Sequence, residues 1–81
     1  MRNKDVEKIL KKKLGEKIAA ARYQKNLSLL ELANILEVDN KSIWRYEAGE
    51  QCPSALRLFD IAKALEINIE DLDPNPETFG E

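Results

Sequence analysis

Two short segments with helical periodicity lie close together near the middle of this sequence, and they constrain the fold more than any other feature. The first spans residues 29–36 and the second spans residues 40–48, so only three residues connect them. Ser28 precedes the first segment and Asp39 precedes the second. Ser and Asp are favoured N-cap residues, because their side-chain oxygens accept hydrogen bonds from free N–H groups of the first helical turn. The sequence therefore predicts two capped helices joined by a tight turn.

The ends of this pair carry two further helix signals. Glu31 stands three residues after Ser28, which is the spacing of a capping box. Gly49 can adopt the left-handed backbone conformation that ends a helix. Two capped helices with so short a connection are typical of a helix-turn-helix, in which the second helix enters the major groove of DNA.

The N-terminal part of the chain has the pattern of one long amphipathic helix over residues 3–24. Gly15 lies inside this pattern, costs about 1 kcal/mol relative to alanine and is a candidate break. Asn26 is a candidate left-handed C-cap after the helix. The apolar positions recur at three- and four-residue steps and are Val6, Ile9, Leu10, Leu14, Ile18 and Ala21.

The C-terminal part of the chain adds two shorter predicted helices and a tail. Ser54 caps a helix over residues 55–65, and Asn68 caps a short helix over residues 69–72. Residues 73–81 are acidic and contain two prolines, so we expect them to form a frayed tail. With no strand pattern in the chain, the expected fold class is all-α with five helices.

These features together resemble the Xre family, the Cro and lambda-repressor type of helix-turn-helix protein. The resemblance rests on short motifs at the family spacing, which are Leu14-Gly15-Glu16-Lys17-Ile18, Arg22, Leu27-Ser28, Glu31-Leu32-Ala33, Val38, Ser42-Ile43, Tyr46-Glu47-Ala48-Gly49, Pro53, Ile61-Ala62, Leu65 and Ile69-Glu70-Asp71-Leu72. It implies a compact five-helix lambda-repressor-like domain that binds double-stranded DNA as a homodimer.

The resemblance also divides the chain into three segments. Residues 14–72 correspond to the helix-turn-helix domain, residues 1–13 form a helical N-terminal extension, and residues 73–81 are the acidic tail. The apolar side chains of the extension need a surface to pack on. We expect that surface to belong to the same domain, and a dimer contact is the alternative. The lysines at positions 11–13 either contact the DNA backbone or form a solvated helix face.

Composition limits the kind of protein and the chemistry of its sites. The 81 residues suit one domain. The chain has no histidine and a single cysteine, Cys52, which excludes an intramolecular disulfide and a cysteine zinc site. Because we find no phosphate loop, nucleophile–base spacing or metal constellation, we expect no enzymatic activity, cofactor, metal or small-molecule substrate. No segment approaches the ~18 apolar residues of a membrane span, and we expect a cytoplasmic protein.

The charges are divided unevenly along the chain. The net charge is −2, which by itself does not suggest a nucleic-acid binder. Residues 1–45, however, hold 11 Lys and Arg against 6 Asp and Glu, a balance of +5. Residues 46–81 hold 2 against 9, a balance of −7. This asymmetry indicates one basic and one acidic face, the alternative being ordinary charged helix surfaces.

The second helix of the motif has one face suited to reading DNA bases. Its inward side consists of Ile43, Tyr46 and Glu47, and its outward side consists of Lys41, Trp44, Arg45 and Ala48, with Asn40 at the N-terminal tip. Asn can read adenine, Lys or Arg can read guanine, and a Trp ring can cover a thymine methyl group. We therefore predict base contacts by Asn40, Lys41, Trp44 and Arg45. Each also has a structural alternative, namely surface cover for Trp44, solubility for the two basic residues and helix initiation for Asn40.

Phosphate contacts are expected at helix starts, where free N–H groups and the positive end of the helix dipole face the DNA backbone. We assign this role to Ser28 at the start of the first motif helix, to Lys25 close before it, and to Ser42 in the first turn of the second.

Arg22 and Glu47 match an arginine and a glutamate that pair in some family members. The resemblance therefore implies a structural ion pair that pins the second motif helix to the first helix of the chain. Two unconnected surface charges are the alternative.

Three positions depart from the family pattern. Leu29 stands where a DNA-contacting Gln is common, Glu37 stands where the turn often has Gly, and Glu50 stands in a loop that often carries Lys or Arg. We expect a left-handed backbone at Glu37 and repulsion of phosphate by Glu50. These departures predict fewer phosphate contacts and a shallower dependence of DNA binding on salt.

The leading functional prediction is a sequence-specific DNA-binding transcriptional regulator, a repressor that acts as a homodimer on a two-fold operator through residues 40–48. The alternative is a protein-interaction module on the same fold, an antitoxin or an adapter, with weak or no DNA binding. The acidic half of the chain and Trp44 favour that alternative.

Overall fold

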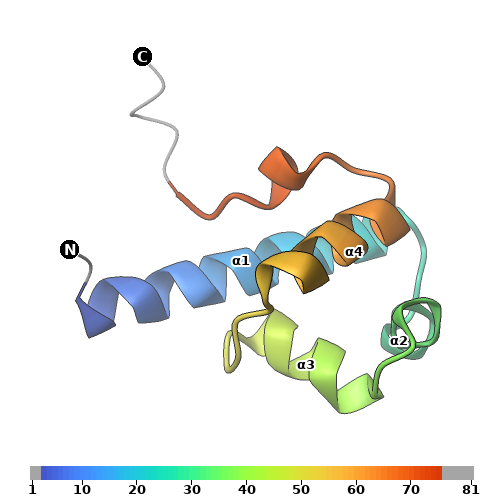
Figure 1. The fold of residues 1–81 in the computed structure, drawn as a ribbon, viewed down its shortest axis with the longest axis horizontal. Coiled ribbons are helices and arrows are strands. Elements are labelled where there is room, and N and C mark those ends of the chain that lie inside the picture. The colour runs from blue at the N-terminus through green and yellow to red at the C-terminus, as the bar shows by residue number, and fades with distance from the viewer. Residues whose placement is uncertain (1–2, 76–81) are drawn as a thin grey trace.

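A long helix, α1, crosses the molecule, and the shorter helices gather around its C-terminal part (Figure 1). The computed structural model describes residues 3–75. Within this range the elements are α1 (Lys4–Gln24), α2 (Leu29–Leu36), α3 (Asn40–Ala48), α4 (Ala55–Leu65) and the 3-10 helix η1 (Ile69–Leu72). The described residues contain no strand, so the predicted all-α class is confirmed.

The fifth predicted helix is a turn of 3-10 helix. The N–H of Asp71 donates to the carbonyl of Asn68 at 2.9 Å, and that of Asp73 donates to the carbonyl of Glu70 at 3.1 Å. Both bonds join residues three apart, which is the 3-10 pattern, and four residues are too few for a ladder of i to i−4 bonds. The five-helix count is therefore corrected to four α-helices and one 3-10 helix within the described chain.

The two motif helices begin as predicted, but only one N-cap side chain is used. Oγ of Ser28 accepts from the N–H of Glu31 at 3.0 Å, and Oε1 of Glu31 accepts from the N–H of Ser28 at 2.7 Å, so the capping box is confirmed. Asp39 occupies the N-cap position of α3, but its side chain makes no cap hydrogen bond. The predicted hydrogen bond from the first turn to the Asp39 side chain is therefore wrong. The N–H of Ser42 donates instead to the backbone carbonyl of Asp39, at 3.0 Å.

Left-handed residues end the helices. Asn26 (φ 61°), Glu37 (φ 59°) and Gly49 (φ 77°) have this conformation, as predicted for each. Glu66 at the end of α4 also has it (φ 59°), which the sequence did not indicate. The left-handed Glu37 reverses the chain after α2, and the N–H of Val38 then donates to the carbonyl of Ala33 at 2.9 Å. These contacts set the angle between the two motif helices.

Helix α1 runs without a break through Gly15, so the expected break is wrong. A Cβ atom at this position would lie 2.4 Å from the carbonyl oxygens of Tyr46 and Glu47. Gly15 is therefore a place where the backbone of α3 packs closely on α1. The physical reason for glycine here is close helix packing and not a change of direction.

A single core joins the helices. Its buried apolar residues come from all five elements and are Leu14, Ile18, Leu32, Ala33, Ile43, Tyr46, Ile61, Ala62, Leu65 and Leu72. Burying each large aliphatic side chain stabilises the fold by roughly 1.5–3 kcal/mol. No helix within residues 3–75 is both long and apolar enough to cross a membrane.

The N-terminal turns of α1 extend past the rest of the fold (Figure 1). Val6 is 41% exposed and Ile9 is 54% exposed, whereas Leu10 is half-buried. The expectation that all three pack on the same domain is therefore wrong for Val6 and Ile9, because the shorter helices do not reach this end of α1.

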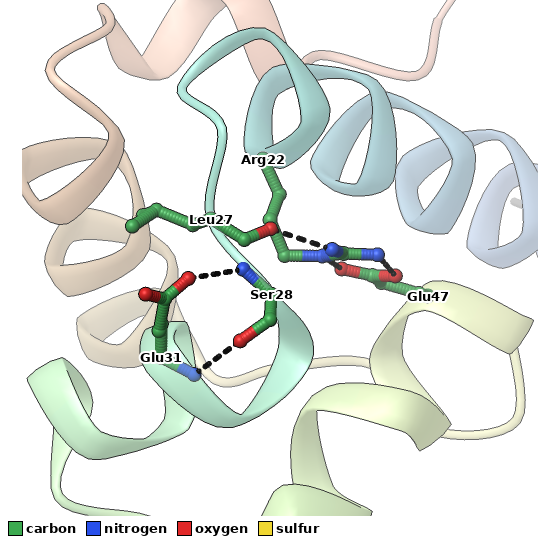
Figure 2. A network of polar contacts seen from close by, with 5 residues as sticks. All are labelled: Arg22, Leu27, Ser28, Glu31 and Glu47. Carbon is green, nitrogen blue, oxygen red and sulfur yellow. Dashed lines mark hydrogen bonds and ion pairs between the residues drawn. The ribbon is translucent and has the colours of Figure 1, made fainter.

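The ion pair between Arg22 and Glu47 is present and joins three elements (Figure 2). Nε of Arg22 donates to Oε2 of Glu47 at 2.7 Å, and Nη2 donates to Oε1 at 3.0 Å. Nη1 donates to the carbonyl oxygen of Leu27 at 2.8 Å. Leu27 directly precedes Ser28 and its capping box, so one guanidinium connects the end of α1, the start of α2 and the end of α3.

The environment of Arg22 favours its charged form. The side chains of Arg22 and Glu47 are only 6% and 11% exposed. Hydrogen bonds to Glu47 raise the pKa of Arg22, although burial acts in the opposite direction. The guanidinium carbon also lies 4.5 Å from the ring centroid of Tyr23. No buried side-chain nitrogen or oxygen in the described residues lacks a hydrogen-bond partner, so this charge is satisfied.

Gly15→Ala tests the close contact between α1 and α3. Alanine is the better helix former by about 1 kcal/mol, but its methyl group meets backbone atoms that cannot rotate away. We expect a net loss of about 1–3 kcal/mol in the free energy of unfolding, measured in urea. Ala20→Gly, at an exposed position of α1, reports helix propensity alone. A more stable Gly15→Ala variant would contradict the contact.

Glu47→Ala tests the ion pair. It leaves the Arg22 guanidinium buried without its carboxylate, and we expect a loss of about 3 kcal/mol in the free energy of unfolding. The matched control is Glu50→Ala, which removes the same charge from an exposed position nearby and should change stability by less than about 0.5 kcal/mol. Similar small effects of both substitutions would show that the pair does not hold α3 in place.

Candidate nucleic-acid interface

Helix α3 turns one side to the core and the other to solvent, as predicted. Ile43 and Tyr46 are buried, and Glu47 is held in the ion pair. The exposed side is formed by Lys41, Trp44, Arg45 and Ala48. Residues spaced by three and four positions line up along a helix, so these four make one continuous stripe. We call them the α3 outer stripe.

The α3 outer stripe combines two cations with one aromatic ring. Trp44 is 49% exposed although it is large and apolar, and Lys41 and Arg45 lie beside it on the helix surface. A surface of this kind offers hydrogen-bond donors for guanine and an apolar face for a methyl group. The inward contacts of α3 and the Arg22–Glu47 pair fix its orientation.

The N-terminal end of α3 is also accessible. Asn40 is exposed and is the first residue of the helix. Ser42 is half-buried, and its N–H is already taken by the carbonyl of Asp39. A contact from Ser42 to a phosphate therefore has to use its hydroxyl group. Asp39 is exposed beside them and brings a negative charge to this end of the helix.

The other two predicted phosphate-binding residues have internal partners. Ser28 is exposed, and its Oγ acts only as an acceptor in the capping box, so its hydroxyl hydrogen is available to donate. Nζ of Lys25 forms an ion pair with Glu66 across the fold, and this pairing lowers the pKa of Glu66. The sequence did not indicate that partner. A phosphate contact by Lys25 has to compete with an exposed carboxylate.

The structure shows the surroundings of the three residues that depart from the family pattern, namely Leu29, Glu37 and Glu50. Leu29 is half-buried and packs against the core, so its position serves folding. Glu37 ends α2 in a left-handed conformation that most residues rarely adopt. Glu50 is exposed just beyond the C-terminal end of α3, near the α3 outer stripe.

A groove between the N-terminal part of α1 and the C-terminal end of α3 was missed by the sequence analysis. Its volume is about 820 Å³. It is lined by Lys4, Glu7, Lys8, Lys11, Lys12, Ala48, Gly49 and Glu50. We call the four lysines the α1 lysine stripe. Their helical spacing could have predicted this stripe, because residues four, seven and eight apart share one face of a helix. In the sequence only the consecutive lysines at positions 11–13 were identified as a basic cluster.

The candidate interface is thus an exposed surface of α3 with helix ends and basic groups around it. Within residues 3–75, no group of three or more His, Cys, Asp or Glu side chains is arranged to hold a metal ion. The chemistry available on this surface is hydrogen bonding, ion pairing and stacking.

Comparison with known proteins agrees with this geometry. A helix-turn-helix family model matches residues 18–72. The restriction-modification controller protein C.AhdI from Aeromonas hydrophila is similar in structure, with a TM-score of 0.72 and 28% identity over 75% of this chain and 92% of that chain. The clp gene regulator ClgR from C. glutamicum has a TM-score of 0.75 and 27% identity over 78% of this chain and 81% of that chain. No curated protein matches the sequence.

The family match covers more than half of the chain and includes both motif helices, the turn and the α3 outer stripe. The chain therefore belongs to the helix-turn-helix family of the Xre, Cro and lambda-repressor type, and it is a DNA-binding transcriptional regulator.

Proposed function

We propose that this protein represses transcription as a homodimer that binds a two-fold operator. The observation that carries the proposal is the α3 outer stripe, which presents Lys41, Trp44 and Arg45 to solvent from a helix fixed by the Arg22–Glu47 pair. Rigid presentation matters because base recognition depends on hydrogen bonds with narrow geometry.

The proposed base contacts follow from the chemistry of each side chain. Asn40 pairs with adenine through two hydrogen bonds, and Lys41 and Arg45 donate to the acceptors of guanine. Trp44 covers a thymine methyl group or a sugar. Each bidentate contact discriminates against a wrong base by about 1–3 kcal/mol.

The proposed phosphate contacts position α3 and add affinity without reading sequence. The hydroxyl groups of Ser28 and Ser42 donate to phosphate oxygens, and Lys25 supplies a positive charge after releasing Glu66. This pairing of Lys25 adds to the reasons why we expect a modest number of phosphate contacts within the half-sites and a shallow salt dependence on a duplex limited to them.

A homodimer would explain the exposed apolar surface of α4 and would suit a two-fold operator. The outward face of α4 carries Leu56, 75% exposed, and Phe59, 57% exposed, and association would remove such apolar surface from water. Two copies related by a two-fold axis would place their α3 helices in successive major grooves, about 34–36 Å apart. We also propose that this regulator acts in the cytoplasm and has no enzymatic activity. The names of the two neighbours, a controller protein and a gene regulator, support the second of these proposals.

Replacing Lys41 and Arg45 together by alanine tests whether the α3 outer stripe reads the operator. We expect the double variant to fold normally and to lose most of its preference for operator over unrelated DNA, by roughly 1–3 kcal/mol per contact. The measurement is binding to the DNA upstream of its own gene, by fluorescence anisotropy at several salt concentrations, with unrelated duplex as competitor.

The matched control is Lys17→Ala plus Lys63→Ala. It removes two exposed positive charges from other parts of the described structure and should leave the operator preference intact. If both double variants retain the same preference, α3 does not read the operator through these residues.

A second candidate function is a protein-interaction module, an antitoxin or an adapter. The exposed Trp44, Leu56 and Phe59 favour it, because a partner protein could cover them equally well. The two functions differ in what the purified protein does. A 9.3 kDa chain that sediments as a dimer and binds operator DNA supports the regulator, whereas a monomer without DNA binding supports the module.

A further inference from the structure

We propose that the α1 lysine stripe binds phosphates of duplex DNA that lie outside the base pairs read by α3. The inference rests on the proposed function, because it concerns the same DNA complex. It assigns a role to the N-terminal turns of α1, which extend past the core and leave Val6 and Ile9 exposed (Figure 1).

The α3 outer stripe continues into the groove that holds the α1 lysine stripe. Ala48 is the last residue of the α3 outer stripe, and it also lines the groove that holds the α1 lysine stripe. The backbones of the two elements come close here, since a Cβ atom on Gly49 would lie 2.8 Å from Cα of Lys12. A DNA backbone that passes along α3 toward its C-terminal end therefore meets the lysines of α1 next.

The α1 lysine stripe runs along one face of the helix over a length that matches several phosphates. Lys4, Lys8, Lys11 and Gly15 are spaced by four, three and four residues, so the lysines continue the face of α1 that packs on α3 at Gly15. From Lys4 to Lys12 the helix rises about 12 Å. That distance corresponds to three or four successive phosphates of one strand, at about 3.4 Å each along the axis.

The groove carries an excess of positive charge. Four lysines line the groove, and Glu7 and Glu50 oppose them. The positive excess suits a polyanion, and lysine suits phosphate because its ammonium group acts as a point charge without strict geometry. The lysines can also offset the repulsion of phosphate that is expected from Glu50. The apolar residues Val6 and Ile9 lie on other faces of the helix, so they do not obstruct the stripe.

The test compares Lys4→Gln plus Lys8→Gln with the wild type on two duplexes from the region upstream of the gene. One is trimmed to the two half-sites, about 20 base pairs, and the other is extended on both sides to about 40 base pairs. Lys13→Gln plus Lys17→Gln is the control, because it removes the same charge from exposed positions of α1 outside the groove. Far-ultraviolet circular dichroism checks that all three proteins are equally helical.

We expect the wild type to bind the extended duplex more tightly and with a steeper dependence on salt. Lys4→Gln plus Lys8→Gln should reduce the slope of log K against log salt by up to about 2 per protomer, and affinity should fall about tenfold. The loss should occur on the extended duplex and be small on the trimmed one. The control variant should behave like the wild type on both.

Two outcomes would overturn the inference while leaving the proposed function standing. In one, the wild type binds the operator and Lys4→Gln plus Lys8→Gln has the same affinity and salt slope. In the other, that variant loses as much affinity on the trimmed duplex as on the extended one, which would place the lysines within the half-sites. A wild type that binds neither duplex would instead contradict the proposed function itself.

Discussion

The geometry of this fold depends on the hydrogen bonds that the guanidinium group of Arg22 donates. It donates two hydrogen bonds to Glu47 at the end of α3 and one to the Leu27 carbonyl just before the N-cap of α2. A planar group with donors in a fixed fork can hold three segments at defined angles, which a lysine cannot do. Because both charged side chains are largely buried, the pair specifies an arrangement more than it adds net stability.

Gly15 on α1 is the second residue on which this arrangement depends, because it allows the backbone of α3 to approach closely. The ion pair draws the end of α3 toward α1, and only a residue without a Cβ atom allows the carbonyls of Tyr46 and Glu47 to come so close. The two features constrain each other, since a bulkier residue at position 15 would move Glu47 away from Arg22. The direction in which α3 presents its outer stripe is therefore set by one charged contact and one glycine.

Local signals predicted much of this structure, and non-local contacts explain where prediction failed. The capping box of Ser28 follows from a short stretch of chain, whereas the left-handed Glu37 followed from the family resemblance, and both predictions are confirmed. The inward and outward sides of α3 follow from helical periodicity. Gly15 was misread as a break because its reason lies in α3, which is distant in sequence. Val6 and Ile9 were expected to be buried but are exposed. This prediction failed because an apolar stripe does not reveal whether a neighbouring helix reaches it.

The distribution of charge in space matters more for DNA binding than the net charge of −2. In the fold, Lys41 and Arg45 are exposed on α3, and four lysines of α1 line a groove that also includes Ala48 at the end of α3. Of the acidic residues in the C-terminal half, Glu47 is neutralised by Arg22 and Glu66 by Lys25. Phosphate is attracted by local potential within about 10 Å, the distance over which salt screens charges at 0.1 M. Each of these pairs also occupies one basic residue, so the positive potential offered to DNA depends on basic residues outside the two pairs, such as Lys41, Arg45 and the α1 lysine stripe.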